Sequence, residues 1–277
     1  MKKSDNTGYY EITDFPKARI PSLDFLSLGD RNHYVKGLIE FDVTNGINKI
    51  REHEKNTGKK ISFTAWLLKC ISQAAHEFKE VHSMRMGKNK VIIFNDVDIS
   101  IAIEKIIEGV KSPMPLVIRK TNKKTVMEIN DEIRKAQSEE LSGATVLGEN
   151  EIKTEMKYYL SLPSWMRRYL IRRKLKDPIK VKQLMGTIIV TSVGMFGNLY
   201  GWPIPTTCHP LAFGVGSITK KPSVIGDKIK IREYLPMTIL FNHDVIDGAP
   251  AARFISRLGE LIESEFGLLN LESFIFF

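Results

Sequence analysis

Cysteine is scarce in this sequence. Only Cys70 and Cys208 occur among 277 residues, each in an apolar context and without a Cys-x-x-Cys spacing. This scarcity argues against a disulfide-stapled fold and against a cysteine zinc cluster, and it fits a reducing compartment.

Histidines at metal-ligand spacing are also lacking. Four histidines have no second candidate ligand at a helical or turn spacing: His33, His53, His76 and His82. His209 directly follows Cys208, but neighbours in an extended segment point to opposite faces, so we expect structural roles for both. We therefore expect no metal site.

Long apolar runs are missing as well. No window reaches the roughly 18 apolar residues of a membrane span. The N-terminal segment lacks the apolar core of a secretory signal. The sequence shows no internal repeat and no low-complexity tract. We expect a cytoplasmic protein.

Basic residues are in excess. Lys and Arg number 41 against 32 Asp and Glu, so the formal net charge is +9, while 43% of the residues are hydrophobic. This composition is that of an ordinary globular protein. The charge favours an anionic partner, such as a phosphate-bearing cofactor, a membrane surface or nucleic acid, without choosing among them. Because no nucleic-acid motif accompanies the charge, nucleic acid is not expected as a partner.

Apolar periodicity predicts strands and helices that alternate irregularly along one domain, residues 1–277. Strands are expected within 34–44, 90–104, 114–120, 186–194, 211–218, 221–235 and 236–243, with a hairpin turn at 226–227. Helices are expected at 45–55, 61–81, 125–137 and 249–265. Frequent hairpins favour an α/β fold with a mixed, mostly antiparallel sheet covered by helices on one side.

Three segments differ from this pattern. Residues 1–32 are predicted to form an extended arm, and residues 150–185 a basic insertion of two short helices. Residues 266–277 form an unusually apolar tail, for which packing on a neighbouring subunit or a membrane-facing patch are the alternatives. The insertion has three interpretations. It is a solvated helix face, or it contacts the phosphates of a cofactor or forms a lid over the substrate channel, or, less favoured, it docks on a membrane surface.

One stretch, LPMTILFNHDVIDGAPAARF at 235–254, combines a strand with chemistry. His243 ends an apolar row, because side chains alternate along a strand. It is either a core histidine satisfied by a carbonyl or a general base in a dry slot. Asp247 is either the N-cap of the last helix or free for another role, such as pairing with an arginine. Pro250 would occupy the third helical position and has no N–H to donate, which weakens the capping role.

The spacing His243-x-x-x-Asp247-Gly248 closely resembles the signature of the dihydrolipoamide acyltransferase components of 2-oxo acid dehydrogenase complexes, and the chloramphenicol acetyltransferases show the same spacing. The similarity is collinear over about residues 15–265. It includes FTAWLLKCISQAAHEF, NDVDISIAIE, MPLVIRKTNKKTVMEINDEI, GTIIVTSVGMFG and PLAFGVGSITKKPSV.

This resemblance implies a chloramphenicol acetyltransferase-like two-layer sandwich that assembles as a homotrimer, or as a larger assembly of trimers, with active sites between subunits. His243 would take the proton of a thiol, either that of coenzyme A or that of dihydrolipoamide. Thr191 would donate its hydroxyl to the developing oxyanion, with Ser192 as the fallback. Asp247 would orient the loop. The substrate would be coenzyme A or acyl-CoA.

Two departures from the family pattern stand out. Asn242 and Asp244 flank His243 where the acyltransferase components usually have Asp and Arg. An adjacent Asp244 would favour protonated imidazole and could disfavour an anionic substrate. No lipoyl domain or attached lipoyl group is expected, so the enzyme would use a diffusible acyl-CoA or a lipoyl domain in trans.

Two other functions remain as alternatives. A non-catalytic trimeric assembly module would share the fold, and an antibiotic O-acetyltransferase would share the chemistry. The sequence does not identify the acyl group, the acceptor or the residues that bind coenzyme A.

Overall fold

The computed structural model describes residues 2–5, 8–12, 15, 20–29, 32–107, 110–138, 158–194 and 200–269. Its α-helices are α1 Ile20–Gly29, α2 Thr44–Thr57, α3 Phe63–Glu77, α4 Val126–Ser138, α6 Ser164–Leu175, α7 Pro178–Met185 and α8 Gly248–Glu263. Its strands are β1 Lys2–Asp5, β2 Gly8–Glu11, β3 Tyr34–Asp42, β4 Met84–Met86, β5 Lys90–Ile92, β6 Ile99–Ile107, β7 Val110–Ile118, β8 Ile188–Ser192, β9 Leu211–Val215, β10 Thr219–Ile225 and β11 Lys228–Asn242.

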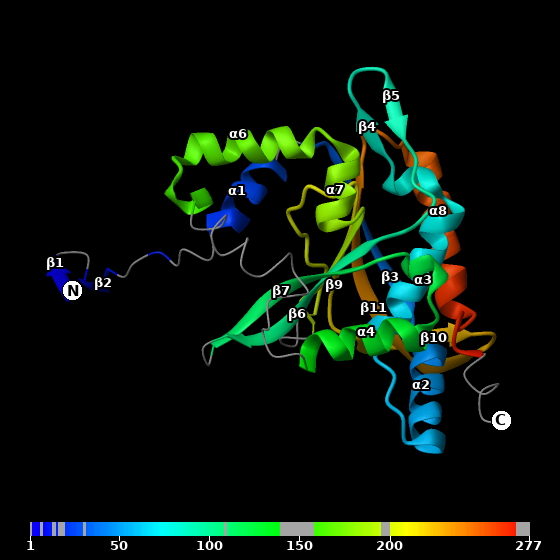
Figure 1. Ribbon diagram of the computed structural model, residues 1–277. Helices are drawn as coiled ribbons and strands as arrows, with labels where there is room; N and C mark the ends of the chain where they lie inside the picture. Colours follow the sequence, from blue (N-terminus) through cyan, green and yellow to red (C-terminus); the bar gives the residue numbers. More distant parts are fainter. Residues whose placement is uncertain are drawn as a thin grey trace.

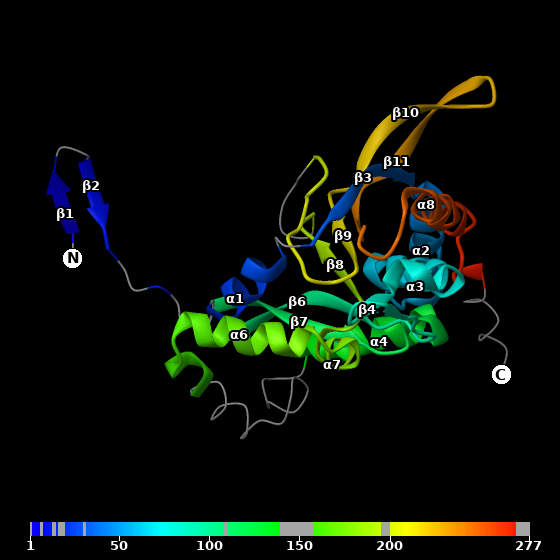
Figure 2. The ribbon, with the colours of Figure 1, turned by 90° about the horizontal axis from the view of Figure 1, so that it is seen from above.

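A seven-stranded mixed sheet forms the centre of the fold (Figure 1). Its order is β10-β11-β9-β8-β6-β7, and β3 pairs with the other edge of β11. Strand β8 runs parallel to both β6 and β9, and the remaining pairs in this sheet are antiparallel. Helices α2, α3, α4 and α8 lie together on one side of the sheet, while α1 and α6 lie on the other (Figures 1 and 2). The expectation of a mixed, mostly antiparallel sheet covered by helices is confirmed. The expectation of helices on one side alone was wrong, because α1 and α6 lie on the other side.

Strand β11 is longer than the sequence suggests. It runs through Pro236, where a break between two strands was expected. Residues up to Tyr234 pair with β10, and pairing with β9 begins at Met237. The Pro236 carbonyl accepts a hydrogen bond from the backbone N–H of Gly216. The ring nitrogen of Pro236 therefore faces the same edge of β11, at the point where the pairing strand changes from β10 to β9. The missing N–H therefore costs no bond to β3 and only one bond beyond the end of β9, and a proline is tolerated inside the strand.

The core lies between the sheet and its helical layer. Helix α3 contributes Trp66, which is fully buried and donates its indole N–H to the Phe266 carbonyl at 3.1 Å. A Cβ atom on Gly46 would lie 2.0 Å from the Trp66 ring, so α2 can cross α3 this closely only with glycine there. Phe241 on β11 packs edge-on against Phe254 on α8, 5.7 Å between ring centroids. This contact holds the last helix against the strand that precedes it.

The N-terminal prediction was wrong in part. The segment 1–32 contains the β1–β2 hairpin and the ten-residue helix α1, not only extended chain. Pro21 is the second residue of α1, a position in the first turn where proline is compatible with a helix. The two-helix prediction for 150–185 is confirmed by α6 and α7, although 150–157 lie outside the described residues.

The start of the apolar tail packs on its own chain. Phe266 contacts the core, and Leu268 is fully buried. The expected contact with a neighbouring subunit therefore does not apply to this part, and 270–277 lie outside the described residues. None of the helices that the structure describes has both the length and the apolar character needed to cross a membrane.

Candidate functional site

His243 lies just beyond the end of β11, in the turn that leads to α8. Its backbone N–H donates to the His33 carbonyl at 2.7 Å. The ring Nδ1 lies 3.8 Å from a carboxylate oxygen of Asp247, and 45% of the side chain is exposed in the single chain. His243 is therefore not a buried core histidine, and within one chain its ring is not in a dry slot either.

Asp247 occupies the N-cap position of α8 without capping it. Its side chain accepts no hydrogen bond from the first turn, as the position of Pro250 predicts. The carboxylate is 89% exposed, and the only ion pair found for it in the described ranges is the one with His243. The expected pairing of Asp247 with an arginine is not seen in the part of this chain that is described.

Asp244 has a partner that the sequence did not indicate. Its carboxylate accepts a hydrogen bond from His33 Nδ1 at 2.9 Å, and its backbone N–H bonds to the Asn242 side chain at 3.0 Å. His33 directly precedes β3, whose first residue Tyr34 pairs with Asn242. Two histidines separated by 210 positions thus meet at this end of the sheet, one of them with no role assigned from sequence.

Thr191 and Ser192 lie at the end of β8 on opposite faces of the sheet. Ser192 and Val190 line a cavity on the side of the helical layer. Thr191, between them, points to the other side, because side chains alternate along a strand. Its register partner is Gly214 on β9, where a Cβ atom would lie 2.0 Å from the Pro203 carbonyl. The segment around Pro203 therefore lies flat on β9 beside Thr191.

Within one chain, Thr191 and His243 are far apart. Thr191 is level with Gly214, which is level with Thr238 on β11. From Thr238 to the strand end at Asn242 is roughly 14 Å at the usual rise, and β8 and β11 are two strand spacings, about 10 Å, apart. The two side chains are thus separated by roughly 17 Å, so a single chain does not bring them together.

The cavity beneath β8 has a volume of about 520 Å³. Apolar side chains of α2, α4, β6 and β8 form its walls, among them Ile47, Ile101, Ile133 and Val190. Its rim has three cationic side chains and one carboxylate: Arg51, Lys60, Arg134 and Glu54.

The first residues of α3 also line this cavity. They are Ser62, the N-cap, and the two residues that follow it, and the Ser62 side chain makes no capping hydrogen bond. The positive end of the helix dipole therefore adds to the basic rim. Sequence periodicity did not reveal this site because its residues come from five separate segments.

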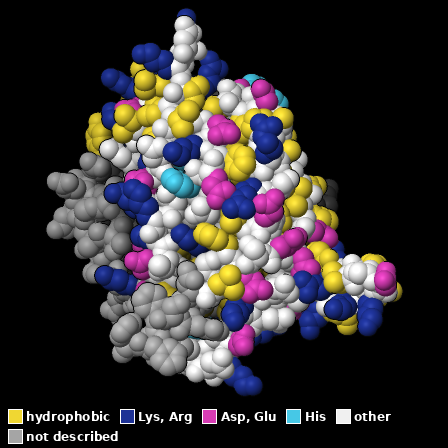
Figure 3. Space-filling model, turned by 90° about the vertical axis from the view of Figure 1, so that its right-hand side faces the viewer, with side chains coloured by type: hydrophobic (Ala, Val, Ile, Leu, Met, Phe, Trp, Pro, Cys, Tyr) yellow, Lys and Arg dark blue, Asp and Glu magenta, His cyan; other side chains and the backbone are white. Residues whose placement is uncertain are grey.

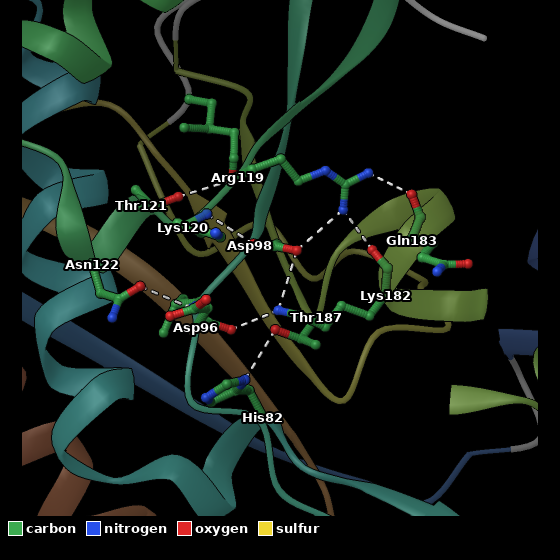
Figure 4. Close-up of polar contacts among 12 residues, drawn as sticks. His82, Asp96, Asp98, Arg119, Lys120, Thr121, Asn122, Lys182, Gln183 and Thr187 are labelled. Carbon is green, nitrogen blue, oxygen red and sulfur yellow. Dashed lines mark hydrogen bonds and ion pairs between the residues drawn. The ribbon is translucent and has the colours of Figure 1, made fainter. Parts of the chain in front are cut away.

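A buried polar cluster fixes the start of β8 (Figure 4). Asp98, 5% exposed, binds Arg119 and Lys182, each at 3.1 Å. Its backbone carbonyl accepts the Thr187 N–H at 3.0 Å, and the Thr187 hydroxyl bonds to His82. Burial is the main cause that lowers the pKa of His82 to about 3, so its ring is neutral. These contacts tie α7 and the start of β6 to β8, the strand that contains Thr191.

Metal ligands do not gather in the described residues. No group of three or more His, Cys, Asp or Glu side chains there is close enough to hold an ion. The polar groups around His243 and Thr191 are an imidazole, carboxylates and a hydroxyl, which suits proton transfer and oxyanion stabilisation.

The sheet order, the helical layer and the placement of these groups define a chloramphenicol acetyltransferase-like fold. A solved chloramphenicol acetyltransferase superposes with a TM-score of 0.50 at 15% identity, covering 95% of this chain and all of that one. A probable dihydrolipoamide acetyltransferase from Listeria monocytogenes gives a TM-score of 0.67 at 22% identity, covering 92% of this chain and 95% of that one. The predicted fold class is confirmed.

The family model for the 2-oxoacid dehydrogenases acyltransferase (catalytic domain) matches residues 35–151 and 165–270, and the chain belongs to this family. A curated relative is the lipoamide acyltransferase component of the branched-chain alpha-keto acid dehydrogenase complex of Bacillus subtilis. It is 26% identical over 234 residues, which cover 82% of this chain and 46% of the relative. The chain thus spans less than half the length of the curated relatives it matches.

Proposed function

We propose that this protein is an acyltransferase that moves an acyl group between coenzyme A and a thiol of the dihydrolipoamide type, or another small acceptor. The observation that supports this most directly is the placement of His243. The ring is accessible at the end of the sheet, next to Asp247, in a chain that belongs to the acyltransferase family. Asp247 keeps the role of a residue that orients the loop.

The reaction would use His243 as general base. Its ring nitrogen accepts the proton of the attacking thiol, and the thiolate adds to the thioester carbonyl. The Thr191 hydroxyl donates a hydrogen bond to the oxygen that becomes negative. One such donor contributes about 3 kcal/mol of transition-state stabilisation in comparable sites. Collapse of the intermediate forms the new thioester and expels the second thiolate, which takes the proton back from the imidazolium.

The active site would lie between two copies of the chain. The separation of roughly 17 Å between Thr191 and His243, estimated from the strand register, supports a site in which each comes from a different copy. A homotrimer, or a larger assembly of trimers, is the arrangement we propose. A lipoyl domain supplied in trans is the acceptor carrier we propose beside free coenzyme A.

The cavity beneath β8 would hold part of coenzyme A. Its basic rim and the N-terminus of α3 suit phosphate groups, and its apolar walls suit the adenine or pantetheine portion. Ser192 lines this cavity, whereas the Thr191 hydroxyl lies on the opposite face of the sheet, so the thioester end would have to pass the end of β8 to reach it. Lys60→Ala and Arg134→Ala should therefore raise KM for acetyl-CoA and leave kcat within about threefold, because they remove binding that is equal in the ground and transition states.

The test of the function is acyl exchange between acetyl-CoA and dihydrolipoamide by the purified protein. His243→Ala should lower kcat by about 10³-fold or more, since the base is lost. His53→Ala, on α2, is the matched control and should leave the rate unchanged. If His243→Ala keeps the wild-type rate, His243 is not the base. A protein that assembles but turns over no acyl thioester would instead be a non-catalytic assembly module.

A further inference from the structure

Two contacts from one residue hold the turn that contains His243. The His33 carbonyl accepts the backbone N–H of His243 at 2.7 Å, and the His33 ring binds the carboxylate of Asp244 at 2.9 Å. Because a carboxylate only accepts hydrogen bonds, Nδ1 of His33 must be the donor. The residue before β3 thus contacts the turn after β11 through both its backbone and its side chain.

The residues on either side of His33 are hydrogen-bonded, while the His33 side chain itself is 81% exposed. Tyr34, the next residue, has its hydroxyl 2.7 Å from the His209 carbonyl and 3.0 Å from the Thr207 carbonyl. Asn32 donates its side-chain amide to the same hydroxyl at 3.0 Å. Burial raises the pKa of Tyr34 to about 12, so this hydroxyl keeps its proton. Tyr34 is therefore anchored to the segment before β9, and this anchors the backbone of the neighbouring His33.

The carboxylate of Asp244 would otherwise be a hazard for the reaction. A free anion beside an imidazole favours the protonated ring, and an imidazolium has no lone pair with which to accept a thiol proton. In this chain the Asp244 carboxylate bonds to His33 and not to its neighbour His243. Asp244 is the charged residue at this turn that departs from the usual family pattern. His33 binds its carboxylate and so directs it away from His243.

We propose that His33 is a positioning residue for His243, which binds Asp244 and so keeps both the turn and the charge of that carboxylate in place for proton transfer. This inference rests on the proposed role of His243 as general base. His33 does not contact the reacting atoms, and its effect passes through Asp244 and the backbone of the turn.

Other titratable and charged groups face this turn and must be considered. Asp247 lies 3.8 Å from His243 on the side of α8. Arg85 on β4 and Cys208 before β9 line a cavity of about 230 Å³ together with Asp244. Since Tyr34 stays protonated, the hydrogen bond between His33 and Asp244 is the contact whose loss would most directly release a carboxylate next to His243.

The test is a mutant cycle on the full chain, with acetyl-CoA and dihydrolipoamide as substrates. His33→Ala keeps the backbone carbonyl and removes only the ring. It should lower kcat roughly tenfold, since small displacements of a base are costly. It should also move the acidic limb of the kcat/KM profile to higher pH, because the released carboxylate favours imidazolium. His33→Asn places an amide donor near the position of Nδ1. It should therefore restore most of kcat and most of the wild-type position of the acidic limb.

Asp244→Ala separates the two effects. It should lower kcat to the same extent without the upward shift of the acidic limb. The double variant should equal Asp244→Ala, because both changes remove one interaction. Lys36→Ala, at an exposed site on β3, is the control. If His33→Ala does not fold, Asp244→Ala and His33→Asn still test the positioning role of His33.

Three outcomes would overturn the proposal. They are a wild-type rate and profile for His33→Ala, additive losses in the double variant, and a wild-type kcat for Asp244→Ala. If any of these outcomes is found while His243→Ala is inactive, only the proposed role of His33 is rejected. An active His243→Ala would instead remove the proposed function itself.

Discussion

The hydroxyl groups of Thr191 and Ser192 are adjacent in sequence but serve opposite faces of the sheet. Thr191→Val removes the hydroxyl and nearly keeps the shape, and it should lower kcat by about 100-fold with little change in KM. Ser192→Ala changes only the wall of the cavity beneath β8, so we expect kcat within about threefold of wild type and an effect confined to KM for acetyl-CoA. Steady-state kinetics with both substrates separates the two. The reverse pattern would assign the oxyanion contact to Ser192.

At this scale, the sequence indicates residue types but not their partners. The spacing of His243 and Asp247 singled out both as candidates, and the alternation of β8 separates Thr191 from Ser192. The partner of Asp244 could not be predicted, because His33 lies 211 positions away. Its selection depends on the register of β3 against β11, which is fixed only when the sheet forms.

At the scale of elements, the β10–β11 hairpin leaves apolar surface uncovered. Val224 and Ile229 are cross-strand neighbours, and Ile231 lies on the same face; all three side chains are more than 70% exposed. The hairpin projects from the body of the molecule in Figure 2, and it forms the narrow arm at the right of Figure 3. Exposed edges of this kind are normally covered by a partner.

We therefore expect this hairpin to contact a second copy. The double variant Ile229→Glu/Ile231→Glu should dissociate the assembly, because it places charges in an apolar contact. Sedimentation velocity at several protein concentrations measures the change in mass. Lys230→Ala, on the opposite face of the same strand, should leave the assembly intact. An unchanged mass for the glutamate variant would exclude the hairpin from the interface.

The elements also show where sequence periodicity was sufficient. Helices α3 and α8 have clear apolar stripes, and both were expected close to their observed bounds. Helix α1 was missed because its apolar residues have no helical periodicity and two prolines stand nearby. The merging of two expected strands into β11 depends on the change of partner at Pro236, which is a property of the whole sheet.

At the scale of the whole molecule, two buried histidines make stability depend on pH. Burial lowers the pKa of His82 to about 3 and that of His209 to about 4, against about 6.5 in the unfolded chain. Between these values the unfolded state binds more protons, so stability falls as pH falls. At pH 5 each histidine should reduce the free energy of unfolding by up to about 2 kcal/mol relative to pH 7.5.

Urea unfolding at pH 7.5 and pH 5 measures this loss. His82→Asn cannot titrate and keeps an amide within reach of Thr187, so it should lose less stability between the two pH values than wild type does. An equal loss in both proteins would show that His82 does not account for the acid sensitivity.

The proposed division of the site between copies leads to the strongest test of the assembled molecule. His243→Ala and Thr191→Val should each be nearly inactive alone. In the closed ring that we propose, each site would take its histidine from one copy and its threonine from the next. Co-expression of the two variants in equal amounts therefore restores both residues at about one site in four, by random assembly. Differently tagged copies allow purification of the mixed assemblies. About a quarter of the wild-type rate in the unfractionated mixture, or about a third in purified mixed trimers, would support a shared site. No recovery in verified mixed assemblies would place both residues in the same chain, against the separation that the strand register gives.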